Sequence, residues 1–188
     1  MTGFLGASNI FIFGDYASIM RNVRENKEYV LFSGENIDLL ALASLVGFHY
    51  NRRATMKNEE SGSSNKKGLK DDDNKGNSIE LSRIQFPKLD NQMWFIARLM
   101  TICMEGSSKQ SRIDLAFREF ANPEGRKKMF EMWFDYALGG LEVLYEKVIE
   151  NGNGDKHQMA ENLFELLEEF KGEESDSNAA IIDDLLRS

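Results

Sequence analysis

The strongest constraint on the fold is one long apolar stripe in the second half of the chain. It follows Asn122-Pro123-Glu124, where an Asn N-cap, a Pro at the first helical position and an acid in the first turn are typical of a helix start. The steps along the stripe are almost all three or four residues, which is the helical period. Its members are Met129, Phe130, Trp133, Phe134, Ala137, Leu138, Leu141, Leu144, Tyr145, Val148 and Ile149. The sequence therefore predicts a long core helix that ends near the Asn151-Gly152-Asn153-Gly154 loop.

Two adjacent glycines, Gly139 and Gly140, interrupt this helix. Each costs about 1 kcal/mol relative to Ala in a helix interior. Such a pair indicates close approach of a neighbouring helix or a bend, and room for a ligand or partner backbone is the less favoured interpretation.

The rest of the chain also favours helices over strands. Apolar spacing predicts helices over about residues 15–25, 36–47, 93–106, 111–120 and 156–171. Within them, Gly47 is expected to end the second helix, Ser111 to cap the fourth, and Cys103 to be a small buried side chain. Residues 28–32 and 79–84 have strand composition and are candidates to pair with each other.

These elements predict a mainly α fold. A length of 188 residues suits a single helical domain over residues 1–171, with a minor two-stranded β element. Residues 57–77 hold five Lys, five acids and a single aliphatic residue, so a solvated, disordered loop is expected there. Residues 172–188 are expected to form an acidic, largely disordered tail.

Charge is concentrated at the carboxyl end. The chain has a formal net charge of −8, and residues 161–188 contain nine acids against Lys171 and Arg187. The end therefore carries −7 and the body is close to neutral, which argues against tight non-specific binding to DNA but leaves room for a local basic patch.

Composition also bears on the compartment. The lone Cys103 excludes an intramolecular disulfide and a cysteine-built zinc site. No apolar run approaches the roughly 18 residues that a membrane span needs, and no secretion signal is recognisable. A cytoplasmic protein without membrane contact is expected.

No set of residues indicates a reaction. The sequence has no phosphate-binding glycine loop, no nucleophile elbow and no metal-spaced ligands around its two histidines, His49 and His157. We expect no catalytic residues, no metal site, no cofactor and no enzymatic activity.

Two basic clusters are candidates for contacting DNA. Arg52 and Arg53 follow the second helix, and the fork of an arginine matches phosphate oxygens. Arg126, Lys127 and Lys128 lie in the first turn of the long helix, where the helix dipole disfavours cations and an external anion would offset them. The alternative for both clusters is a solvated, solubilising face.

A short apolar group interrupts the acidic tail. Ile181, Ile182, Leu185 and Leu186 can form one face of a helix that docks into a partner groove. The same residues can equally cap the chain's own domain by folding back.

Two stretches resemble a known family. They are LLALASLVGFHYNRR, from Leu39 to Arg53, and FEMWFDYALGGLEVL, from Phe130 to Leu144. Together they are similar to small accessory proteins associated with bacterial DNA phosphorothioation (Dnd) systems, the fourth such associated family. A more remote similarity is to the small helical DndE-type component, which is linked to DNA binding and from which this chain departs by lacking basic character overall.

The resemblance implies a context of antiviral DNA modification or restriction, with no catalytic residues to carry across. The leading expectation is a non-enzymatic accessory subunit that contacts other subunits of such a defence system. The alternative is a DNA-binding component that uses the local basic patch. The partner and the oligomeric state are left open by the sequence.

Overall fold

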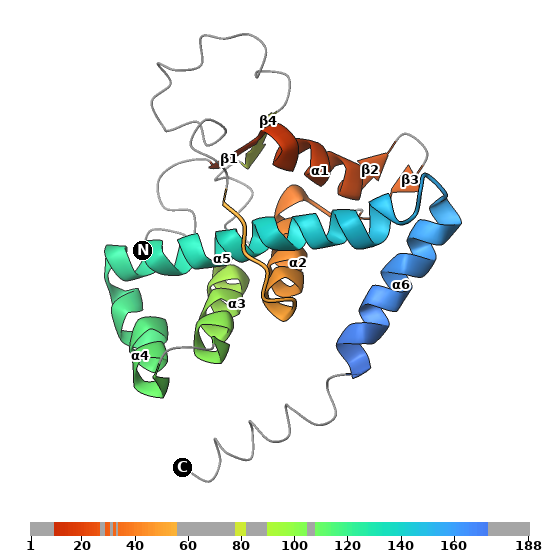
Figure 1. Ribbon diagram of the computed structural model, residues 1–188. Helices are drawn as coiled ribbons and strands as arrows, with labels where there is room; N and C mark the ends of the chain where they lie inside the picture. Colours follow the sequence, from red (N-terminus) through yellow and green to blue (C-terminus); the bar gives the residue numbers. More distant parts are fainter. Residues whose placement is uncertain are drawn as a thin grey trace.

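The computed structural model describes residues 10–26, 29–30, 32, 34–55, 78–81, 90–104 and 108–172. The fold is mainly α, as predicted, with small antiparallel strand pairs beside the helices. Helix α5 crosses the molecule, with α2 and α3 on one side of it and α1 on the other (Figure 1).

Helix α5 (Pro123–Leu144) is the predicted long helix and the centre of the core. The Asn122 side chain caps it by accepting a hydrogen bond from the Gly125 N–H at 2.7 Å. Trp133 and Leu141, both from the predicted stripe, are 1% and 0% exposed. The expectation that this helix is the inner support of the fold is confirmed.

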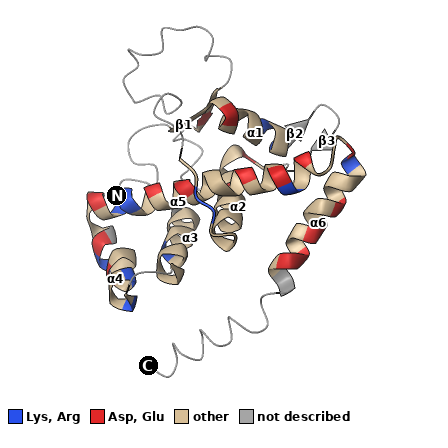
Figure 2. Cartoon of the chain, in the orientation of Figure 1, with Lys and Arg blue, Asp and Glu red and all other residues tan. Residues whose placement is uncertain are grey.

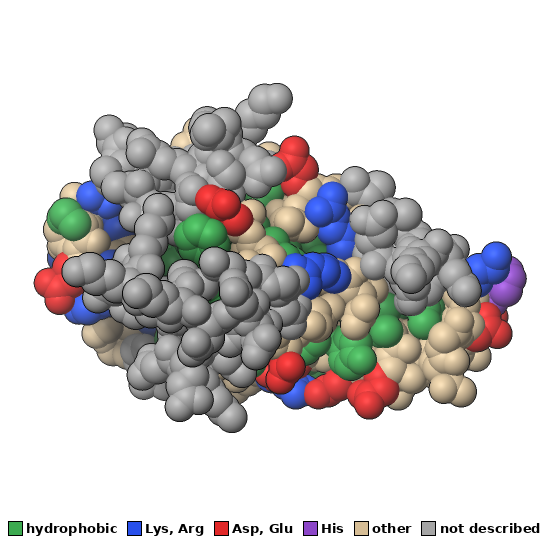
Figure 3. All heavy atoms as spheres, turned by 90° about the horizontal axis from the view of Figure 1, so that it is seen from above, with side chains coloured by type: hydrophobic (Ala, Val, Ile, Leu, Met, Phe, Trp, Pro, Cys, Tyr) green, Lys and Arg blue, Asp and Glu red, His purple; other side chains and the backbone are tan. Residues whose placement is uncertain are grey.

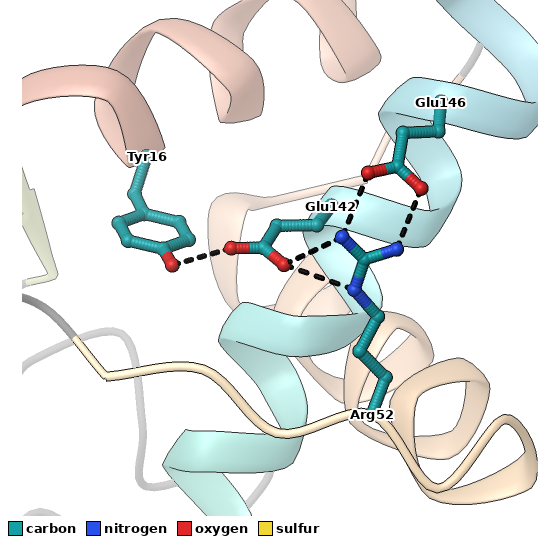
Figure 4. A network of polar contacts seen from close by, with 4 residues as sticks. All are labelled: Tyr16, Arg52, Glu142 and Glu146. Carbon is teal, nitrogen blue, oxygen red and sulfur yellow. Dashed lines mark hydrogen bonds and ion pairs between the residues drawn. The ribbon is translucent and has the colours of Figure 1, made fainter.

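The same helix continues without a break as a π-helical segment, η4 (Tyr145–Glu150). There the N–H of Asn151 donates to the carbonyl of Glu146, five residues earlier, at 3.2 Å. The wider turn changes the direction in which successive side chains leave the helix. Within this segment Val148 is buried and Glu146 is exposed, and the Glu146 carboxylate points towards Arg52, which follows α2 (Figure 4).

Helix α2 (Asn36–His49) packs against α5 at backbone distance. A Cβ on Gly140 would lie 1.7 Å from the Ala43 carbonyl oxygen, and one on Gly47 would lie 2.0 Å from the Tyr136 carbonyl oxygen. A Cβ on Gly139 would lie 2.1 Å from the Arg52 carbonyl oxygen. The predicted close approach at the glycine pair is therefore confirmed, and all three glycines serve it.

The remaining helices surround this pair. They are α1 (Gly14–Arg24), α3 (Asp90–Cys103), α4 (Lys109–Ile113), the π-helical η2 (Asp114–Arg118), the short 3₁₀ turn η3 (Glu119–Ala121) and α6 (Lys156–Gly172). Buried Ala17, Met20 and Val23 of α1 and buried Met93, Ala97 and Met100 of α3 belong to the same core as α5. One core thus joins helices that are far apart in the chain.

The strand pairing differs from the prediction. Strand β4 (Ser78–Leu81) pairs antiparallel with β1 (Ile10–Phe13), which has the sequence IFIF. Strand β3 (Tyr29–Val30) instead pairs with its neighbour β2 (Glu25–Asn26) in a hairpin. The pairing of residues 28–32 with 79–84 was wrong because a local hairpin joins sequence neighbours, and composition does not specify the partner of a four-residue strand.

Two predicted helix boundaries were also wrong. Gly47 does not end α2, since the helix continues to His49 and Gly47 faces α5. Ser108, and not Ser111, caps α4, because its side chain accepts from the Ser111 N–H at 3.1 Å. The predicted loop at residues 57–77 lies outside the described residues, as do all residues of the predicted acidic tail after Gly172.

Candidate interaction surface

Arg52 forms the centre of a polar network that ties three parts of the fold together (Figure 4). Its guanidinium donates to both oxygens of Glu146, at 2.6 and 2.7 Å, and its Nε donates to Glu142 at 3.0 Å. The hydroxyl of Tyr16, on α1, donates to the other oxygen of Glu142 at 2.6 Å. The paired geometry on Glu146 is the strong, fork-like form of the arginine–carboxylate contact.

The chain reaches this position through a left-handed turn after α2. Asn51 has φ of 48°, a conformation that Asn tolerates, and the Arg52 N–H then donates to the Gly47 carbonyl at 2.8 Å. Hydrogen bonds from Arg52 lower the pKa of Glu146, and those with Glu146 raise the pKa of Arg52. Arg52 therefore already has carboxylate partners in the fold, and a phosphate would have to compete with them.

Arg53 lies next in the chain but has a different environment. Its guanidinium stacks over the Tyr136 ring, 4.5 Å from the centroid, and its Nη2 donates to the Tyr136 hydroxyl at 3.0 Å. The side chain stays exposed. Partial burial raises the pKa of nearby Asp135, and the charge of Arg53 opposes that rise.

Arg53 also lines a pocket of about 280 Å³ at the end of α2 and α3. The other lining residues are Phe48, His49, Asn51, Cys103, Met104 and Tyr136. Cys103 is exposed there, so the prediction of a buried thiol was wrong. The residue sits on the outward side of α3, one turn beyond Leu99, and the apolar residues around it in sequence belong to two different faces.

The second basic cluster lies away from the first. Lys127 and Lys128 are on the first turns of α5, exposed and within 3.7 and 3.9 Å of Glu131 and Glu124. Arg126 donates to the Ala121 carbonyl at 3.3 Å. The backbone of Arg52 packs against Gly139 of α5. Gly139 lies eleven residues after Lys128 on the same helix, which is a rise of about 17 Å along its axis. The structure does not bring the five predicted basic residues together (Figure 2).

Helix α3 carries two apolar stripes. The inner one is buried in the core, whereas Phe95 and Leu99, one turn apart, are 61% and 45% exposed. Ile102 and Cys103 continue the outer stripe towards the pocket, partly buried and exposed respectively. An outward apolar stripe of this kind is what a protein-binding helix presents.

Phe117, on the neighbouring segment η2, is 57% exposed and extends this stripe sideways. The Arg98 guanidinium of α3 lies 6.0 Å from the centroid of its ring. We call Phe95, Leu99 and Phe117, with Arg98 among them, the α3 face. Exposed large apolar side chains grouped in this way, with a cation beside them, mark a contact site more often than isolated ones do.

Helix α6 also has two faces. Met159 and Leu166 are buried, whereas Phe164 and Leu167 are exposed. Acidic residues recur along α6 (Figure 2); the exposed ones include Glu161, Glu165, Glu168 and Glu169. The exposed apolar residues of α6 are therefore set in a negative surface, unlike those of the α3 face.

The carboxyl end of α6 is tied to the end of α2. The Phe170 ring lies 4.2 Å from the ring of His49, and Lys147 binds Glu169 at 3.0 Å. Tyr50 donates a hydrogen bond to Glu169, and that bond lowers the pKa of Glu169. These contacts bring the last described residues of the chain close to the pocket that His49 lines.

The face on the α1 side shows no comparable grouping of described side chains. Basic and acidic groups are interspersed there among apolar ones (Figure 3). Within the described ranges, no three His, Cys, Asp or Glu residues are placed to hold a metal ion. No described helix is long and apolar enough to cross a membrane. The predicted partner-binding residues Ile181, Ile182, Leu185 and Leu186 lie outside the described residues.

Sequence reasoning missed the α3 face, although a signal for it exists. The helix has apolar residues at nine of the eleven positions from 93 to 103, more than one core-facing stripe requires. Sorting them by helical angle separates Met93, Ala97 and Met100 from Phe95, Leu99 and Ile102. The carboxylate partners of Arg52 have no such signal, because they lie about 90 residues away in the chain.

No family model, no curated protein and no solved structure matches the chain.

Proposed function

We propose that this chain is a non-enzymatic accessory subunit of a bacterial DNA modification or restriction system, and that it acts through protein contacts. The family context comes from the resemblance of residues 39–53 and 130–144 to Dnd-associated accessory proteins. The observation that carries the proposal in the structure is the α3 face, where Phe95 and Phe117 are 61% and 57% exposed.

The chemistry of this face suits a protein partner. Burying a large apolar side chain contributes about 1.5–3 kcal/mol, so three such residues supply the centre of a moderate interface. Arg98 adds a positive charge beside the Phe117 ring, and arginine is enriched in protein interfaces. A partner with an apolar helix flanked by acids fits this combination.

Co-purification with the products of the adjacent genes tests the proposal. Tagged chain should retain a component of the modification or restriction machinery, identified by mass spectrometry. The double variant Phe95→Asp/Leu99→Asp should lose it, whereas Leu167→Asp, which places one such charge on the exposed side of α6, should keep it. A chain that stays alone at micromolar concentration contradicts the proposal.

A second candidate function is direct contact with DNA. It is favoured by Lys127 and Lys128, which are 74% and 56% exposed and lie beside Arg126 at one end of α5. Phosphate contacts by these side chains would give binding that weakens steeply with salt. Lys127→Glu/Lys128→Glu should then abolish a shift of duplex DNA at low salt, and no shift by the native chain excludes this function.

A further inference from the structure

The α3 face leaves a specific question, namely what covers it when no partner is present. The face groups three exposed large apolar side chains, those of Phe95, Leu99 and Phe117. The pocket at the end of α3 contributes two further apolar side chains, Met104 and Phe48. We propose that the chain's own carboxyl-terminal segment, residues 179–186, binds the α3 face in cis and covers these apolar side chains.

The first support is the sequence of that segment. Placed on a helix, Ile181, Ile182, Leu185 and Leu186 occupy one side, and Asp183 and Asp184 occupy the other. This is the amphipathic pattern of a segment that docks on an apolar helix face. Eight residues of helix are about 12 Å long, which equals the rise of α3 between Phe95 and Cys103.

The second support is reach. Helix α6 ends at Gly172, and Phe170 holds that end against His49. His49 and Cys103 line the same pocket. The Cys103 end of the outer stripe of α3 therefore lies near the carboxyl end of α6. The six residues 173–178 can span up to about 20 Å when extended, which gives the segment reach from the end of α6 past the pocket towards α3.

The third support is charge, which selects α3 over α6. Residues 173–188 contain five acids and one base, Arg187. The α3 face has Arg98 beside Phe117, and Arg53 lines the adjacent pocket. The exposed Phe164 and Leu167 of α6 lie instead among glutamates, which repel an acidic segment.

The consequence is an autoinhibitory contact. A partner that uses the α3 face must displace residues 179–186, and its apparent affinity is reduced by the fraction of molecules in which the face is free. This consequence rests on the proposed function, whereas the docking itself does not. Docking is therefore tested on the isolated full chain, with no partner present.

Cys103 provides the first readout because it is the sole cysteine and lies exposed on the outer side of α3. Its rate of reaction with a chromogenic disulfide reagent is measured in the full chain and in Ile181→Ser/Leu185→Ser, which leaves every charge in place. The variant should react at least about fivefold faster if the docked form holds more than ~80% of the molecules. Leu167→Ser should react like the native chain, and equal rates in all three proteins overturn the proposal.

A cross-link provides the second readout and separates docking in cis from docking between copies. Leu185→Cys, oxidised with glutathione disulfide, should join Cys103 within one chain at a rate independent of protein concentration. Gln158→Cys, exposed at the far end of α6, should not form this bond. A covalent dimer as the main product, or an unchanged rate when Ile181→Ser and Leu186→Ser are added, overturns docking in cis.

Discussion

The carbonyl oxygen of Ala43 faces Gly140 so closely that a Cβ on this glycine would lie 1.7 Å from it. Helices α2 and α5 therefore meet at backbone distance, with Gly47 and Gly139 providing similar space on either side. This contact fixes the end of α2, from which Arg52 and Arg53 project.

Gly140→Ala is expected to destabilise the protein by about 3 kcal/mol or more, because the new methyl group meets backbone atoms that cannot rotate away. Urea denaturation followed by circular dichroism measures the change. Glu131→Ala, on the exposed side of the same helix, should change stability by less than about 0.5 kcal/mol. A Gly140→Ala protein as stable as the native one would mean that the helices do not pack in this way.

Arg52→Ala is expected to destabilise the fold by about 1–2 kcal/mol, since it removes the cation that bridges Glu142 and Glu146, two carboxylates one helical turn apart. Arg52→Lys should recover only part of this loss, because an ammonium cannot bind both oxygens of Glu146 and the Glu142 oxygen in the same fork. Denaturation midpoints of the three proteins test the ranking. Equal stability of Arg52→Ala and the native chain would contradict it.

Acid should weaken this network. Hydrogen bonds from Arg52 hold the pKa of Glu146 below its ordinary value of 4.5, so the folded state binds this proton less readily than the unfolded state does. The stabilisation is therefore fully present above that value and is lost as the pH falls through the lower, folded pKa. The raised pKa of Asp135 acts in the opposite direction, because its proton is favoured in the folded state.

The Arg52 contribution is isolated by comparing native and Arg52→Ala proteins at two pH values. Their stability difference should be larger at pH 7 than near pH 3. A difference that stays constant, or grows on acidification, would show that the Glu146 carboxylate does not interact with Arg52 as described.

Asn122→Ala is expected to cost about 1 kcal/mol through loss of the cap on the Gly125 N–H. Asn122→Asp should retain the stability, because its carboxylate accepts the same hydrogen bond and favours the helix N-terminus. Thermal denaturation is the measurement, and an unaffected Asn122→Ala midpoint contradicts the cap.

Phe95→Ser and Leu99→Gln should leave the folded state nearly unchanged, within about 0.5 kcal/mol, because their side chains are largely exposed. Trp133→Ala, by contrast, should cost about 3–5 kcal/mol because the indole is 1% exposed in the core. Strong destabilisation by Phe95→Ser would show that this residue belongs to the core and that the α3 face is not free for contacts.

The helical part of the fold was predictable because its signals are local. The stripe on α5 and the Asn122 cap lie within one helix. The close approach of another helix at Gly139 and Gly140 was predictable because glycine is costly in a helix interior unless space is needed there. Pairing of β1 with β4 was not predictable, because each strand is four residues long and composition alone does not choose a partner.

Side-chain partnerships across the chain were beyond local signals. Residue type made Arg52 a candidate phosphate ligand, with a solvated side chain as the alternative, yet in the structure it is bound by Glu142 and Glu146, about 90 residues away in the chain. Cys103 was predicted as buried because its neighbours are apolar, although only half of them face inward. In both cases tertiary position, and not residue type, decides the environment.

An affinity measurement decides whether the α3 face binds a protein of the defence system, as proposed above. Native chain, Phe95→Asp/Leu99→Asp and Leu167→Asp are titrated against the purified products of the adjacent genes by calorimetry. We expect binding by the native chain and by Leu167→Asp, with affinity lowered at least about tenfold in the double variant. Equal affinity of all three proteins, or no binding by the native chain, would contradict it.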